Sequence, residues 1–127
     1  MTTDDDTPRT SDLDGLAVYD QPLPTRDPRS VPVLPLAVAP LRHSPHTLWA
    51  IAALEQRTRL GVVRYGQPLH TYNGRDSLRD LREEVLDAWQ YLTQACAEGR
   101  IAPEDALVME GDLTSLLARL APKEPTP

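Results

Sequence analysis

Residues 64–87 have the sequence RYGQPLHTYNGRDSLRDLREEVLD, in which a turn-rich stretch leads directly into a helical pattern. Asp76 or Ser77 can cap this helix at its N-terminus. The helix carries four acids at positions i, i+3, i+4 and i+7, which are Asp80, Glu83, Glu84 and Asp87. This spacing places them on one side of the helix, which we call the acidic face. Because neighbouring like charges repel unless a cation lies among them, the pattern indicates a site for a hard divalent metal such as Mg²⁺.

The acidic face also has a purely structural interpretation. Charged positions on an amphipathic helix usually face solvent. Arg79 and Arg82 lie within one turn of these acids and can pair with them locally. The spacing alone is consistent with both interpretations.

The apolar spacing predicts three helices and an all-α fold. The first is expected over residues 45–65, with Ser44 as its N-cap and Pro45 at its first position. The second should end at Gly99, and the third should open with Pro103. No alternation typical of strands and no internal repeat is found in the sequence.

Each expected helix has an apolar stripe. In the first helix the stripe comprises Leu48, Ile51, Leu54, Thr58, Val62 and Tyr65. In the second it comprises Leu78, Leu81, Val85, Trp89, Leu92 and Cys96. In the third it comprises Leu107, Leu113, Leu116, Leu117 and Leu120. About 75 ordered residues make a small core, so we expect a homodimer or higher homo-oligomer to complete the helical bundle.

Glu55 lies inside the apolar stripe of the first helix. At about 100° per residue it projects between Leu48 and Val62, so its carboxylate is expected to point toward the core. Two helices would then offer carboxylates to one space. The structural alternative is a glutamate at the rim of the core, paired with Arg57 or Arg59.

The ends of the chain differ in composition from the helical part. Residues 1–43 contain seven prolines after an acidic start, so we expect a disordered tail, followed by a domain over residues 44–121 and a short tail over 122–127. No stretch is apolar enough to cross a membrane, no basic secretion signal is present, and Cys96 is the single cysteine. These features favour a cytoplasmic protein. The net charge of −6 without a basic stripe argues against a nucleic-acid polymer as partner.

Several short motifs together resemble one protein family. They are Tyr65-Gly66-Gln67-Pro68-Leu69, Asn73-Gly74-Arg75-Asp76-Ser77-Leu78, Asp80, Glu83-Glu84-Val85-Leu86-Asp87-Ala88 and Tyr91-Leu92. The combination resembles the MazG-like nucleotide pyrophosphohydrolases, and most of all the phage-type branch that includes dATP/dGTP diphosphohydrolases. The resemblance covers roughly residues 48–95. It implies an all-α, oligomeric enzyme that uses Mg²⁺ or Mn²⁺ to cleave a nucleoside triphosphate into the monophosphate and pyrophosphate.

The resemblance also implies roles for individual residues. The family binds metal through Glu-x-x-Glu and Glu-x-x-Asp motifs on adjacent helices, and Glu84 and Asp87 match the second motif. The first motif is incomplete, because Glu55 is followed three positions later by Thr58. Another alignment takes Glu83-Glu84-x-x-Asp87 as the first motif and seeks the second near Glu110 and Asp112.

On this basis the expected metal ligands are Glu55, Glu84 and Asp87. Asp80 or Glu83 would support the metal or accept the proton of the attacking water. Arg75 would contact a phosphate oxygen, and Asn73 would hydrogen-bond the base or sugar. The alternative function is a non-catalytic helical interaction protein that keeps the fold and uses the tail as its binding segment. In that case Asn73-Gly74 is only a turn and Asp76 only a helix cap.

Overall fold

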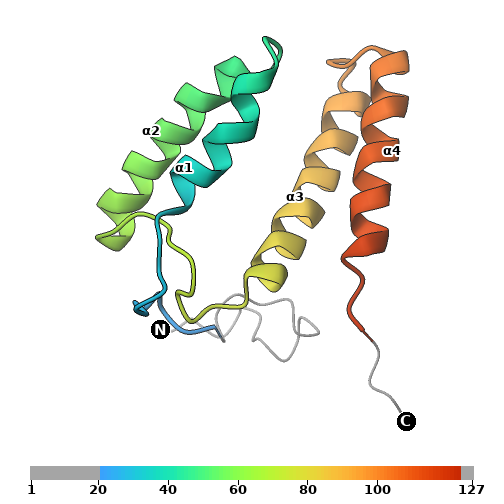
Figure 1. Cartoon of the computed structure of the whole chain (residues 1–127). Helices are drawn as coiled ribbons and strands as arrows, with labels where there is room; N and C mark the ends of the chain where they lie inside the picture. The colour runs from blue at the N-terminus through green and yellow to red at the C-terminus, as the bar shows by residue number, and fades with distance from the viewer. Residues whose placement is uncertain (1–20, 124–127) are drawn as a thin grey trace, which may run out of the picture. The chain divides into compact units, whose positions relative to one another are not determined.

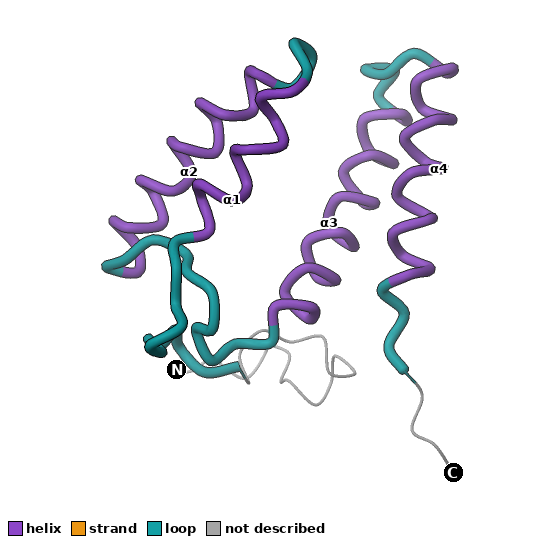
Figure 2. Tube along the Cα trace, in the orientation of Figure 1, coloured by secondary structure: helices purple, strands orange, loops and turns teal. Residues whose placement is uncertain are grey.

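The computed structural model describes residues 21–123, and the termini on either side lie outside the described part. The described residues form four α-helices and one 3-10 helix, as Figure 2 shows. The elements, in chain order, are α1 (Val33–Val38), η4 (Ala39–His43), α2 (Leu48–Tyr65), α3 (Ser77–Ala97) and α4 (Pro103–Arg119). Within residues 21–123 no strand is formed, so the all-α prediction is confirmed.

The chain divides into two compact units. The first, which we call the central unit, is Pro22–Arg75 and contains α1, η4 and α2. The second, the C-terminal unit, contains α3 and α4 and also includes Gln21. In each unit two helical segments run side by side in opposite directions, α1 and η4 against α2, and α3 against α4 (Figure 1).

The segment before α1 is ordered by the loop that follows α2. The Val33 N–H donates to the carbonyl of Leu69 at 3.0 Å, and the Thr71 N–H donates to that of Val31 at 2.9 Å. An isolated antiparallel bridge between Pro32 and His70 joins the same segments. The N-terminal segment therefore pairs with the loop as a short extended ribbon.

The predicted tail is therefore wrong for residues 21–43, while the part over residues 1–20 lies outside the described residues. The prolines of this stretch occupy positions that need no N–H donor. Pro32 is the N-cap of α1, Pro35 lies in its first turn, and Pro40 is at the start of η4. A proline-rich composition therefore did not prevent an ordered segment here.

The start of α2 also differs from expectation. Residues 44–47 form a turn instead of the first helical turn, because the Ser44 hydroxyl accepts the His46 N–H at 3.1 Å. The Thr47 hydroxyl donates to the carbonyl of Leu41 at 2.9 Å and ties the turn to η4. Thr47, and not Ser44, is the N-cap of α2.

The C-terminal unit follows the sequence expectation closely. The Asp76 carboxylate caps α3 by accepting the Arg79 N–H at 3.1 Å. Gly99 directly follows Glu98, the C-cap of α3, with φ 71°, which glycine adopts without strain. Pro103 opens α4 as its first residue. At the far end of the helix pair, the Arg82 Nε donates to the carbonyl of Leu120 at 2.7 Å.

The buried core within the described residues is small. Its apolar members are Val38, Val85, Leu92 and Ala106, and no described side chain is fully buried. The predicted stripes are only partly covered, since Ile51, Leu54 and Cys96 are half-buried whereas Leu48, Tyr65, Leu78 and Leu107 are exposed. After Pro103, three members of the predicted stripe, Leu113, Leu117 and Leu120, are half-buried, and the covered face of α4 also includes Ala106. Large apolar side chains therefore remain exposed on every long helix.

His70 is the buried polar residue of the central unit, with 4% of its surface exposed. Its Nε2 lies 2.7 Å from the carbonyl oxygen of Thr25, and its Nδ1 lies 3.2 Å from that of Pro68. The ring therefore joins the N-terminal segment to the loop after α2. None of the helices in residues 21–123 combines the length and apolar character required to cross a membrane.

Candidate functional site

The acidic face lies on α3, on the side opposite the buried Val85 and Leu92. Glu84 and Asp87 are exposed and lie one turn apart. Asp80 is half-buried and accepts a hydrogen bond from the Gln21 Nε2 at 2.9 Å. Glu83 is half-buried and pairs with the guanidinium of Arg79, whose Nε lies 3.6 Å from its Oε1. The face therefore combines two acids that contact neighbouring side chains with two that face solvent.

These contacts bear on a metal site in two ways. The Arg79–Glu83 pair confirms that local ion pairing relieves part of the repulsion on the acidic face. Among residues 21–123, no three or more His, Cys, Asp or Glu side chains are grouped so that they could hold a metal ion. Glu84 and Asp87 still offer two carboxylates, and Mg²⁺ commonly takes one or two from the protein and fills its other positions with waters and substrate phosphates. The donor set of α3 fits such an ion.

Glu55 does not point into a core. It is exposed in the middle of α2, which contains no buried residue, so the predicted inward carboxylate is wrong for this chain. Thr58, which stands where the resemblance expects an acid, is half-buried and donates its hydroxyl to the carbonyl of Leu54 at 2.9 Å. The role of Glu55 as a metal ligand stays a prediction.

Asn73 and Gly74 form a turn with a defined geometry. The Asn73 side-chain oxygen accepts the Arg75 N–H at 3.1 Å, and its carbonyl accepts the Thr25 N–H at 2.8 Å. Gly74 has φ 81°, and a Cβ at this position would lie 2.8 Å from the Thr25 Oγ1. Glycine is therefore required both by the backbone conformation and by the close approach of the N-terminal segment. Asn73 has a structural role in this turn, which leaves its proposed contact with base or sugar untested.

Arg75 reaches the N-terminal segment from the other end of the loop. Its Nη1 donates to the carbonyl of Pro22 at 2.9 Å. The side chain is half-buried. Its guanidinium is therefore positioned by a segment whose composition had predicted a disordered tail.

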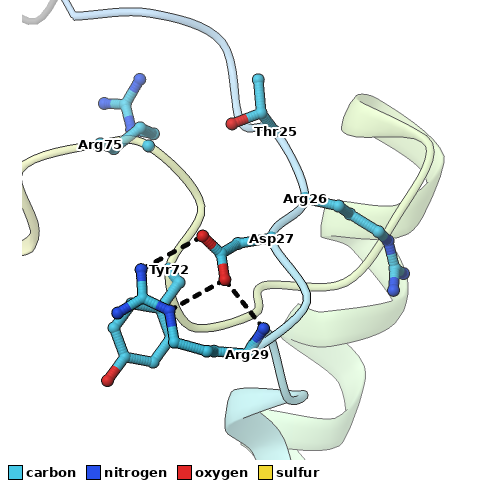
Figure 3. Close-up of a pocket in the computed structure, with 7 residues that line it drawn as sticks. Thr25, Arg26, Asp27, Arg29, Tyr72 and Arg75 are labelled. Atoms are coloured by element: carbon cyan, nitrogen blue, oxygen red, sulfur yellow. Dashed lines mark hydrogen bonds and ion pairs between the residues drawn. The ribbon is translucent and has the colours of Figure 1, made fainter.

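Beside this loop lies a hollow of about 430 Å³ that no sequence motif indicated. Its lining comes from two segments of the central unit and consists of Thr25, Arg26, Asp27, Arg29, Tyr72, Gly74 and Arg75. Figure 3 shows Arg26 and Arg75 on opposite sides of Asp27, and the Arg29 guanidinium over the ring of Tyr72. The distance from the Arg29 Cζ to the ring centroid is 3.9 Å, a cation–π contact.

Asp27 organises its side of the hollow. Its Oδ1 accepts the Arg29 backbone N–H at 2.8 Å and the Arg29 Nε at 3.0 Å, while its Oδ2 accepts the Nη2 at 3.1 Å. The side-chain hydrogen bond from Arg29 is the main cause that holds the pKa of Asp27 below its ordinary value, and the same bond raises the pKa of Arg29. The only hint in the sequence was the pair Asp27 and Arg29 two positions apart, a spacing typical of an Asx turn.

Comparison with known proteins adds nothing to these contacts. No family model matches the chain, and neither a curated protein nor a solved structure shows significant similarity to it.

Proposed function

We propose that the chain is a metal-dependent nucleoside triphosphate pyrophosphohydrolase of the MazG-like kind, which cleaves an NTP or dNTP to the monophosphate and pyrophosphate. The observation that carries the proposal is the acidic face of α3, where exposed Glu84 and Asp87 stand one turn apart with Asp80 one turn before Glu84. The motif resemblance given above supports it.

In this proposal Glu84 and Asp87 hold Mg²⁺ or Mn²⁺, with Glu55 as a further predicted ligand. The bound ion would neutralise the triphosphate and lower the pKa of a coordinated water so that it can attack phosphorus at neutral pH. Asp80 and Glu83 accept the proton of that water or orient the ligands, as carboxylates within one helical turn are able to do. Arg75 contacts a phosphate oxygen through its guanidinium.

The exposed apolar surface supports an oligomeric state. Val63 is 85% exposed, Trp49 72% and Leu107 72%, whereas the core of the single chain is small. Apolar surface of this extent on a small protein is typical of an interface. We propose that a second copy covers part of it, as a dimer or a larger homo-oligomer. Sedimentation at micromolar concentration tests this, and a monomer whose melting temperature does not change on dilution would contradict it.

A second candidate function is a non-catalytic helical interaction protein. Two observations favour it, the hydroxyl of Thr58 in place of a second acid on α2 and the engagement of Glu83 with Arg79. The exposed apolar faces would then serve a partner protein instead of a second copy.

Pyrophosphate release separates the two functions. The full chain is incubated with a panel of NTPs and dNTPs, with Mg²⁺ or with Mn²⁺, and released pyrophosphate is measured. The enzyme proposal expects metal-dependent release that is abolished in Glu84→Gln and Asp87→Asn. Absence of release with every nucleotide and both metals, from a protein that is folded by circular dichroism, would favour the interaction protein.

A further inference from the structure

Positive charge is concentrated in the central unit. Residues 22–75 contain seven arginines and no lysine but only two acids, Asp27 and Glu55, so their formal charge is +5 in a chain whose net charge is −6. Three of the seven arginines line one hollow, namely Arg26, Arg29 and Arg75. Because Asp27 is the single acid in that lining, the formal charge around the hollow is +2. A charge of this sign attracts an anion.

The guanidinium groups are positioned before any ligand arrives. The Arg26 Nε donates to the Gln67 Oε1 at 3.2 Å, and the Arg75 Nη1 is held by Pro22. Arg29 is fixed between the Asp27 carboxylate and the Tyr72 ring. A guanidinium carries five N–H donors, so Arg26 and Arg29 each have donors beyond those that these contacts use. Guanidinium N–H donors of this kind suit the recognition of phosphate oxygens.

The backbone at Tyr72 is unusual for its residue type. Its φ is 49°, the only positive φ of a non-glycine residue within residues 21–123. A left-handed conformation costs a residue such as tyrosine on the order of 1–2 kcal/mol, and conformations of this kind cluster at ligand-binding sites. Here it places the aromatic ring beneath the Arg29 guanidinium at the edge of the hollow. The strained residue thus serves to orient a cation.

The size of the hollow limits the class of ligand. A volume of about 430 Å³ falls in the range of small-molecule sites and is lined by only two short segments of one unit. A nucleic-acid polymer would need a longer charged track with interleaved aromatic side chains. The lining therefore favours a compact anion with at least two charged groups.

We propose that this hollow binds a diphosphate group, as found in the polyphosphate of a nucleotide or in inorganic pyrophosphate. That a nucleotide supplies the diphosphate group rests on the proposed function. In the hollow, Arg26, Arg29 and Arg75 contact the diphosphate. Asp27 opposes binding, because its carboxylate occupies the Arg29 donors and repels the anion. Removing a guanidinium and removing this carboxylate should therefore change the affinity in opposite directions.

The test is isothermal titration of the full chain with inorganic pyrophosphate, without metal and at low ionic strength. Arg26→Gln and Arg29→Gln should each weaken binding about threefold or more, since each removes charge-assisted hydrogen bonds at a partly screened site. Asp27→Asn should tighten binding, and its amide oxygen can still accept the Arg29 backbone N–H. The control is Arg42→Gln, which removes the same charge from an exposed position of the central unit outside the hollow and should change affinity by less than about twofold.

Several outcomes would overturn the proposal. The first is the absence of pyrophosphate binding by the wild type. The second is a loss of pyrophosphate affinity in Arg42→Gln as large as that in Arg26→Gln or Arg29→Gln. The third is weaker pyrophosphate binding in Asp27→Asn. The proposal would also fail if the chain bound duplex DNA more tightly than pyrophosphate and if Arg42→Gln and Arg29→Gln weakened DNA binding equally. Arg26→Gln keeps the test valid if Arg29→Gln disturbs the loop, because Arg26 does not contact Asp27 through any hydrogen bond drawn in Figure 3.

This result is separable from the enzyme test. If pyrophosphate binds with the expected pattern but no nucleotide is cleaved, the diphosphate site stands and the enzyme proposal fails. If nucleotides are cleaved while Arg26→Gln and Arg29→Gln leave both pyrophosphate affinity and KM unchanged, the enzyme proposal stands and this site fails.

Discussion

The Nε2 atom of His70 lies 2.7 Å from the carbonyl oxygen of Thr25, a residue 45 positions earlier in the chain. The other ring nitrogen faces a second carbonyl, that of Pro68, at 3.2 Å. A neutral imidazole has one N–H and can donate to only one of these oxygens, whereas the protonated ring can donate to both. Each ring nitrogen thus faces a carbonyl oxygen, so the ring can donate a hydrogen bond from whichever nitrogen carries the proton. One buried side chain thus fastens the N-terminal segment to the loop that carries Asn73 and Arg75.

Replacing His70 with alanine should destabilise the central unit. The change removes a buried side chain and the long-range hydrogen bond, and we expect a loss of about 1–3 kcal/mol in the free energy of unfolding. Urea denaturation followed by circular dichroism measures this loss. His43→Ala is the matched control, because His43 is exposed at the end of η4, and it should change stability by no more than about 0.5 kcal/mol. Equal losses in the two variants would show that the His70 contacts contribute nothing specific.

Two glycine substitutions should have opposite signs. Gly74→Ala places a Cβ 2.8 Å from the Thr25 Oγ1 at φ 81°, so it should destabilise the protein by about 1 kcal/mol or more. Gly61→Ala lies inside α2 with no atom within 4 Å of the new Cβ, so it should stabilise by about 0.5–1 kcal/mol. Thermal unfolding of both variants checks the signs.

A third variant separates the two causes at Gly74. Thr25→Ala removes the hydroxyl that the new Cβ would meet, so the cost of Gly74→Ala should fall in the double variant, leaving the part due to the positive φ. If the cost is the same in both backgrounds, the close approach of Thr25 has no energetic effect.

The sequence predicted the C-terminal unit better than the central unit, and the reason is physical. The Asp76 cap, the glycine at 99 and the proline at 103 are local signals that depend on a few neighbouring residues. The order of residues 21–43 depends instead on hydrogen bonds to residues 69–73, which no local pattern records. Because composition carries no information on long-range contacts, it led to the prediction that residues 21–43 are a disordered tail.

The contrast between local signals and long-range contacts also explains which candidate sites the sequence revealed. Helical spacing located the acidic face on α3, because it follows from the periodicity of one element. It offered local pairing of Arg79 as an alternative, which the contact with Glu83 confirms, but the expected inward position of Glu55 in the apolar stripe of α2 is wrong, because Glu55 remains exposed. The hollow at Asp27 requires two segments separated by more than forty residues, so no motif in either segment could reveal it.

The ion pair in the hollow should have a measurable pH dependence. The hydrogen bond from Arg29 lowers the pKa of Asp27 below the ordinary 3.8. Because the folded-state pKa is depressed, the contact stabilises the loop above the ordinary carboxyl pKa, and the contribution is lost as the pH falls through the folded value. Carboxyl ¹³C shifts of Asp27 should titrate with a midpoint below 3.8, and Arg29→Gln should raise that midpoint. An unchanged midpoint in the variant would mean that the two side chains do not interact in solution.

The last prediction separates a metal site from a solvated acidic face. If Glu84 and Asp87 hold a divalent cation, Mg²⁺ or Mn²⁺ binds the folded state and should raise the melting temperature of the wild type. Glu84→Gln and Asp87→Asn should each abolish that gain. Without metal, the same variants should be no less stable than the wild type, since each removes a like-charge contact on one helix face.

Glu104→Gln provides the matched control for this measurement, because Glu104 is an exposed acid in the first turn of α4, away from the acidic face. Its metal response should equal that of the wild type. If Glu84 and Asp87 only face solvent, the amide variants should change stability by no more than about 0.5 kcal/mol and leave the metal response unaltered. Equal metal responses in the wild type, Glu84→Gln and Asp87→Asn would therefore exclude the proposed ligands, whatever the activity assay shows.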